Sequence, residues 1–211
     1  MTAVKSQNQF GSLLWPKGWI SLLCGWLLAV QAQAADTLFT NLLAQGAVAG
    51  TNGDISAAVK IYSAAEQLEA NNAADFCLLT KRFCDLMHIT SSSDLQKTLA
   101  AKALACAKKA VQADPPSATA HLCVVVGCAK NFPFVDTRTK VVFSRLIKSE
   151  SERAIALDPK QDVAYYMLGR WNFGVANMNF LERGFVKLVY GGLPPASNDE
   201  AIKDLKQAVV L

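Results

Sequence analysis

The feature that most constrains this chain is a helix-ending turn that recurs at a nearly constant interval. Each copy follows a short apolar segment, and the turn residues are Asn71, Asp114 and Asp158, which lie 43 and 44 positions apart. Asn and Asp compete for backbone hydrogen bonds and so end helices. Pro115 and Pro159 come next, and proline cannot continue one helix but can open another. A fixed period of this size indicates an array of helical repeats.

The segments between the turns have the apolar spacing of amphipathic helices. One begins at a capping box, Ser93-Asp94-Leu95-Gln96, after which apolar residues recur every three or four positions. The turns are followed by further apolar segments at about 73–89, 117–131 and 161–175. We therefore expect an all-α fold without strands over residues 55–211.

A single helical hairpin cannot bury its apolar face alone, so such hairpins stack on one another. We expect the six helices between Ile55 and Val175 to form three antiparallel hairpins, with the longer connections 90–93 and 132–140 inside hairpins. This is similar to tetratricopeptide repeats, whose first helix carries a large-x-x-Leu-small pattern that Tyr165-x-x-Leu168-Gly169 matches. The residues expected to pack between helices are Thr80, Val125 and Gly169.

The first 34 residues have the layout of a secretory signal peptide. Two lysines precede an apolar run of about 12 residues, Trp19–Val30, and the small residues of Ala32–Ala35 follow. We expect residues 1–34 to be removed on export to the periplasm or the exterior, and residues 35–54 to form a partly helical lead-in. A membrane anchor that is not cleaved is the alternative, although a span needs about 20 apolar residues.

Charge and cysteine usage exclude several classes of function. Lys and Arg number 21 against 17 Asp and Glu, and they are spread along the chain, so no nucleic-acid partner is expected. Five cysteines follow residue 34 without a CxxC motif; export would permit disulfides, but packing between helices explains the cysteines better. Cys84 and His88 are one helical turn apart, yet His121 is the only other histidine, so we expect no metal and no cofactor.

The stretch after the third turn is the most specific part of the chain. It reads LGRWNFGVANMNFLER at 168–183 and continues as GGLPPASNDEAI at 191–202. With Cys84-Asp85-Leu86 and Glu152–Pro159, it resembles the regulator of microtubule dynamics family over about residues 55–211. The resemblance implies a tetratricopeptide-like stack, protein interaction and, in animal members, association with microtubules.

Within this stretch, residues 180–190 suit a short amphipathic helix inserted in the third hairpin, as in the related proteins. As a lid on the stack, the helix would bury Phe180 and Phe185 together with Trp171. As a docking arm, it would present them to a partner, and a membrane-surface helix is a third alternative. The candidate residues for the lid or for partner binding are Trp171, Phe180, Arg183, Phe185 and Tyr190.

The main hypothesis for function is a non-enzymatic interaction module that holds a protein or peptide ligand in its concave groove. One alternative is a membrane-anchored structural component of an envelope or organelle-membrane assembly, with membrane contact only through the N-terminal segment. Another is an enzyme that uses Asp85, His88 and Glu182, although no spacing joins these residues into roles. The sequence does not define an oligomeric state.

The last helix expected from the sequence, 199–211, stops one residue before its Asp should follow. Val210 and Leu211 would have no neighbour to cover them, and the end of a helical stack needs a polar outer face. We expect either a truncated form or a dimer that covers this end.

The small residues at Ala32–Ala35 predict a mature N-terminus at Ala35 or Asp36. N-terminal sequencing of the protein purified from its native host measures this directly. An intact Met1 in a membrane fraction would contradict export and support the anchored alternative.

Overall fold

Helices make up all the regular secondary structure in the part of the chain that the structure describes, residues 17–68 and 72–211. The structure is a computed structural model, and its side chains are described at 33–34, 36–68 and 72–211. The elements are α1 (Lys17–Thr51), α2 (Ile55–Glu66), α3 (Ala73–Ile89), α4 (Ser93–Ala113), α5 (Ala118–Asn131), the 3-10 helix η1 (Phe132–Phe134), α6 (Thr137–Leu157), α7 (Asp162–Ala176), α8 (Phe180–Tyr190) and α9 (Asn198–Val210). The predicted all-α fold is confirmed.

Most helices begin where a polar side chain accepts a hydrogen bond from a backbone N–H that has no partner within the helix. Ser197 caps α9, and its Oγ accepts from the N–H of Glu200 at 3.1 Å. The cap of α4 is Ser92 rather than Ser93, with 3.4 Å between Ser92 Oγ and Leu95 N. The predicted start of this helix was therefore one residue late.

The Asp turns end α4 and α6 in the same way. The backbone N–H of Asp114 donates to the carbonyl four residues earlier at 3.0 Å, and that of Asp158 does so at 2.9 Å. Pro115 and Pro159 follow in exposed turns that lead into α5 and α7. Asn71, the first of the predicted turn residues, lies outside the described residues.

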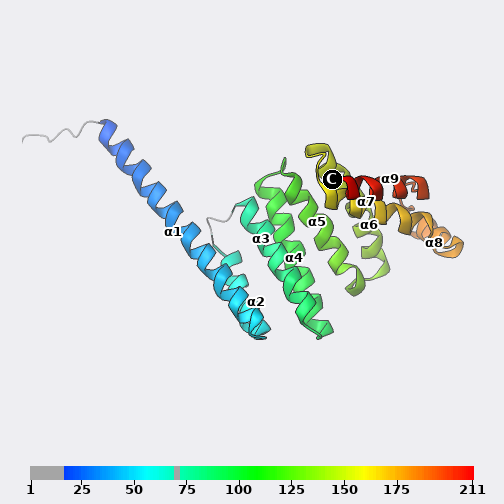
Figure 1. Cartoon of the computed structure of the whole chain (residues 1–211), viewed down its shortest axis with the longest axis horizontal. Coiled ribbons are helices and arrows are strands. Elements are labelled where there is room, and N and C mark those ends of the chain that lie inside the picture. Colours follow the sequence, from blue (N-terminus) through cyan, green and yellow to red (C-terminus); the bar gives the residue numbers. More distant parts are fainter. Residues whose placement is uncertain (1–16, 69–71) are drawn as a thin grey trace, which may run out of the picture.

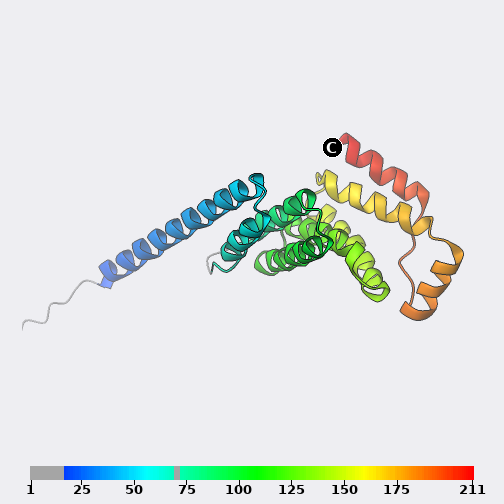
Figure 2. The ribbon, with the colours of Figure 1, turned by 90° about the horizontal axis from the view of Figure 1, so that it is seen from below.

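The closest helix pairs are α3 with α4, α5 with α6, and α7 with α9, and α1 pairs with α2 (Figures 1 and 2). Contacts between α4 and α5 are also extensive, so successive hairpins stack, whereas α2 and α3 contact each other less. The expected grouping of six helices into three hairpins is corrected, because α2 takes α1 as its partner and α7 takes α9. The lead-in before Ile55 is itself a helix and supplies the partner for α2.

Two hydrophobic clusters follow from this stacking. The first lies among α1–α4 and includes an edge-to-face pair, Tyr62 and Phe83, with 6.0 Å between ring centroids. The second lies among α4–α7 and includes Val125, Ile147 and Trp171. Helix α4 contributes buried residues to both clusters and so connects them along the stack.

The N-terminal helix α1 spans 35 residues and crosses the expected cleavage position between Ala34 and Ala35 without a break. It covers most of the expected lead-in, 35–54. Within the described part of the chain, no helix combines the length and the apolarity that crossing a bilayer requires.

Helix α8 projects from the C-terminal end of the stack (Figure 2) and is attached mainly through arginines. Arg183 donates to the carbonyls of Val175 and Ala176 at the end of α7, at 3.1 and 2.8 Å. Arg145 of α6 donates to the carbonyl of Gly192 at 2.6 Å, just after α8. Val186 is the buried residue of this helix.

The apolar face of α8 points outward. Phe180, Leu181 and Leu188 are 86%, 80% and 87% exposed, and Phe185 is 51% exposed. The expectation that a lid would bury Phe180 and Phe185 with Trp171 is therefore wrong for both phenylalanines, although Trp171 is buried. The reason is that hydrogen bonds to backbone carbonyls, rather than apolar packing, position this helix.

Replacing Gly169 by Leu should destabilise the hairpin of α7 and α9. A Cβ at Gly169 would lie 2.8 Å from Cγ of Leu205 and 3.1 Å from the carbonyl oxygen of Ala201. Overpacking of this kind costs about 1–3 kcal/mol of unfolding free energy, measured by chemical denaturation.

Gly174→Leu is the matched control on the same helix, because a Cβ there meets nothing within 4 Å. We expect this change to leave stability unchanged or to raise it, since Leu favours helix more than Gly does. Equal effects of the two changes would contradict the close approach at Gly169.

Candidate binding groove

A groove of about 980 Å³ lies among α5, α6, α7 and α8. Its walls are largely apolar and include Val126, Val141, Ile147, Met167 and Val175. Three consecutive elements of the stack form the floor, and α8 closes one side. The groove therefore depends on the stacking of the α5–α6 hairpin on α7 and on the position of α8.

Trp171 links the floor of the groove to the core. Its indole Nε1–H donates to Oγ of Ser144 at 2.9 Å, and both side chains are buried. The ammonium of Lys148 lies 5.1 Å from the centroid of the Trp171 ring, a cation–π distance. These contacts fix the indole between α6 and α7, so its exposed edge offers a rigid apolar surface to the groove.

Charged side chains stand at the rim of the groove. Lys130, Lys140 and Arg170 come from α5, α6 and α7, and Glu182 comes from α8. Lys140 Nζ is 5.9 Å from the centroid of the Phe132 ring. Arg170 donates to the hydroxyl of Tyr166 at 3.1 Å. The rim is thus more positive than negative.

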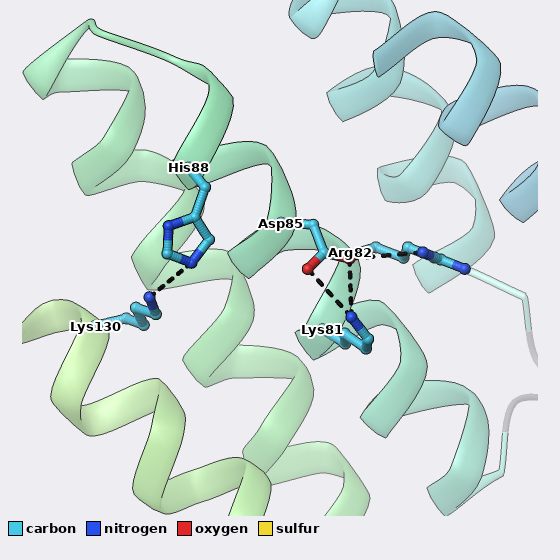
Figure 3. Close-up of polar contacts among 5 residues, drawn as sticks. All are labelled: Lys81, Arg82, Asp85, His88 and Lys130. Carbon is cyan, nitrogen blue, oxygen red and sulfur yellow. Dashed lines mark hydrogen bonds and ion pairs between the residues drawn. The ribbon is translucent and has the colours of Figure 1, made fainter. Parts of the chain in front are cut away.

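Polar side chains of α3 form a separate set that does not line the groove (Figure 3). Asp85 is bonded to Lys81 at 3.3 Å and to Arg82 at 3.5 Å. His88 Nε2 lies 3.0 Å from Nζ of Lys130. An ammonium can only donate, so His88 accepts through Nε2 and carries its proton on Nδ1.

The structure brings some of the predicted partner-binding residues together and separates others. Trp171 and Phe185 both line the groove, and Phe180 does not. The rings of Phe185 and Tyr190 pack edge to face with centroids 5.9 Å apart. Arg183 is occupied by its bonds to the end of α7, which gives it a role in holding α8.

The predicted packing residues lie inside the stack. Thr80 is buried and its Oγ1 donates to the carbonyl of Ala103 on α4 at 3.2 Å. Val125 is fully buried. A close approach that the sequence analysis missed is at Gly127, where a Cβ would lie 3.0 Å from Cα of Leu104. Gly127 matches the large-x-x-apolar-small pattern only loosely, because Cys123 stands at the position of the large residue.

The cysteines provide no evident nucleophile. Burial raises the pKa of the Cys106 thiol to about 12 and that of Cys128 to about 12, so both stay protonated at neutral pH. A hydrogen bond between Cys77 and Cys123 lowers the pKa of Cys77 and raises that of Cys123. All five cysteines from Cys77 onward are free thiols.

In the described part of the chain, no three His, Cys, Asp or Glu side chains come close enough together to hold a metal ion. His88, half of the Cys84–His88 pair, contacts Lys130 instead. Asp85 and His88 lie on α3, and Glu182 lies on α8. Of the three side chains considered for an enzyme, Glu182 therefore comes from a different helix than the other two.

The likeness to known proteins agrees with this architecture. A sequence model of the family described as Regulator of microtubule dynamics protein 1-3 matches residues 42–211. The chain belongs to this family. The match begins within α1 and includes every helix of the stack that lines the groove.

Individual members of the family are distant in sequence. Regulator of microtubule dynamics protein 3 of Xenopus laevis is 27% identical over 130 residues, which are 62% of this chain and 28% of that protein. Regulator of microtubule dynamics protein 1 of Bos taurus is 25% identical over 145 residues, 68% of this chain and 46% of that protein. The chain thus spans less than half of the length of these two relatives.

Among solved structures, the match to a crystal structure of MamA covers 78% of this chain and 92% of the MamA chain, at 19% sequence identity. The TM-score is 0.28, a likeness too slight to bear on the fold.

Ser144→Ala should destabilise the protein through Trp171. The change removes the acceptor of the indole N–H and leaves a buried donor unsatisfied, which costs about 1–3 kcal/mol. Ser149→Ala is the matched control on α6, because Ser149 is exposed and bonds only within its own helix. Chemical denaturation followed by far-UV circular dichroism should show the loss at Ser144 alone, and equal losses would contradict the anchoring role.

Proposed function

We propose that this chain is a non-enzymatic interaction module that holds a segment of a partner protein in the groove among α5, α6, α7 and α8. The groove itself carries the proposal: about 980 Å³, with apolar walls and a few polar groups at the rim, it has the general character of a ligand site. Stacked helical hairpins present such concave surfaces to extended segments of other proteins. Membership in a family of proteins named as regulators supports the same role.

The module acts, in this proposal, outside the cytoplasm after removal of residues 1–34. The supporting observation is the order of two lysines, an apolar run and small residues at Ala32–Ala35. The relatives are named for the regulation of microtubule dynamics. An exported protein does not meet microtubules, so that role is not part of the proposal.

A membrane-anchored structural component is the second candidate. The apolar run Trp19–Val30 favours it if the segment is retained. The position of the mature N-terminus separates the two, because an interaction module released by cleavage would begin at Ala35 or Asp36. The groove is the same in both cases.

Phe185→Asp should abolish partner binding without unfolding the protein. Phe185 lines the groove and is 51% exposed, so a charge there spoils the apolar wall while little packing is lost. We expect the melting temperature to change by no more than about 2 °C. The measurement is quantitative mass spectrometry of proteins from the native host that cross-link to the immobilised full chain.

Phe180→Asp is the matched control, since Phe180 lies on the same helix, is 86% exposed and does not line the groove. The control should retain every partner that the unchanged chain enriches. Loss of partners in both variants would place the binding surface on the outer face of α8, and loss in neither would contradict binding in the groove.

A further inference from the structure

The charges at the rim of the groove indicate what kind of partner segment fits. Among the side chains that line it, Lys130, Lys140 and Arg170 are positive and Glu182 is the single negative one. The whole chain carries a formal net charge of only +4, with 21 basic and 17 acidic residues. The excess of positive charge at the groove is therefore local, and it needs an explanation of its own.

The three cations are not neutralised within the described part of the chain. None of Lys130, Lys140 and Arg170 takes part in an ion pair there. Their contacts are with a neutral imidazole, the Phe132 ring and a tyrosine hydroxyl. Each cation thus keeps its capacity to pair with a carboxylate from outside.

Figure 3 shows why Asp85 of α3 does not neutralise Lys130. Asp85 points toward Lys81 and is paired with Lys81 and Arg82. Lys130 points toward His88, which is neutral because it accepts from the ammonium. The ammonium of Lys130 is consequently held at the rim by a contact that leaves its charge intact.

The cations also stand on three successive elements of the stack, α5, α6 and α7, so positive charge reaches the groove from each of them. The floor between them is apolar and excludes a purely polar ligand. We propose that the groove takes an acidic amphipathic segment of a partner protein, in which apolar side chains contact the floor and flanking Asp or Glu side chains pair with Lys130, Lys140 and Arg170. This inference rests on the proposed function and specifies its partner.

A series of peptides that share one pattern of apolar residues but differ in charge tests the proposal. Fluorescein-labelled 12-residue peptides keep four leucines in place and carry Glu, Gln or Lys at the other positions. Fluorescence anisotropy with the full 211-residue chain measures their affinities. We expect the Glu peptide to bind roughly tenfold more tightly than the Gln peptide, and the Lys peptide to bind most weakly.

Charge reversal on the protein provides the matched variants. Lys140→Glu should weaken binding of the Glu peptide about three- to tenfold and strengthen binding of the Lys peptide. Lys160→Glu, in the exposed turn before α7, makes the same change of net charge away from the groove and should alter neither affinity. Equal effects of Lys140→Glu and Lys160→Glu would show that affinity follows the net charge of the chain and not the charge at the groove, which would overturn the proposal.

The remaining outcomes separate this inference from the proposed function. Equal affinity for the Glu and Gln peptides would overturn the charge preference and leave a peptide groove. Absence of binding by all three peptides would count against both the charge preference and the proposed peptide groove. Displacement of the Glu peptide by an equally charged single-stranded DNA oligomer would show a general polyanion site, and the inference would fail.

Discussion

Close approach of helix backbones at small residues is the constraint on which the rest of this structure depends. Thr80, Gly127 and Gly169 each lie where a neighbouring helix leaves little or no room for a larger side chain. An amphipathic hairpin gains stability only when its second apolar face is covered, and it is covered only if the next hairpin can come close enough. The two hydrophobic clusters and the groove beside the second are results of these approaches.

Much of this architecture could be predicted because the signals were local. The spacing of Asp114 and Asp158, the proline after each and the 3.6-residue periodicity all act within a few positions of the chain. Those signals gave the class of fold and the approximate ends of the helices. The error of one residue at Ser92 and Ser93 has the same local origin, because either serine can cap α4.

The remaining features depend on neighbours that are distant in sequence. The pairing of α2 with α1 could not be read from residues 55–66, since it depends on the preceding segment being helical as well. The rim of the groove was missed for a similar reason. Lys130, Lys140 and Arg170 each look like solvated residues on their own helix, and only the stacking brings them to one opening.

Helix α8 shows how polar contacts can override an apolar pattern. Its sequence suits a helix that packs onto the stack, yet Arg145 and Arg183 hold it by the carbonyls at its own end and at the end of α7. Charge-assisted hydrogen bonds of this kind hold α8 firmly in position. They do not require its apolar face to be buried, so that face can point toward solvent. One wall of the groove therefore belongs to a helix whose one buried residue is Val186, and the floor belongs to the packed helices of the stack. Segments with few buried contacts open at lower free energy than the core, so α8 is the wall that would adjust if the proposed partner segment binds, while Trp171 and its neighbours stay in place.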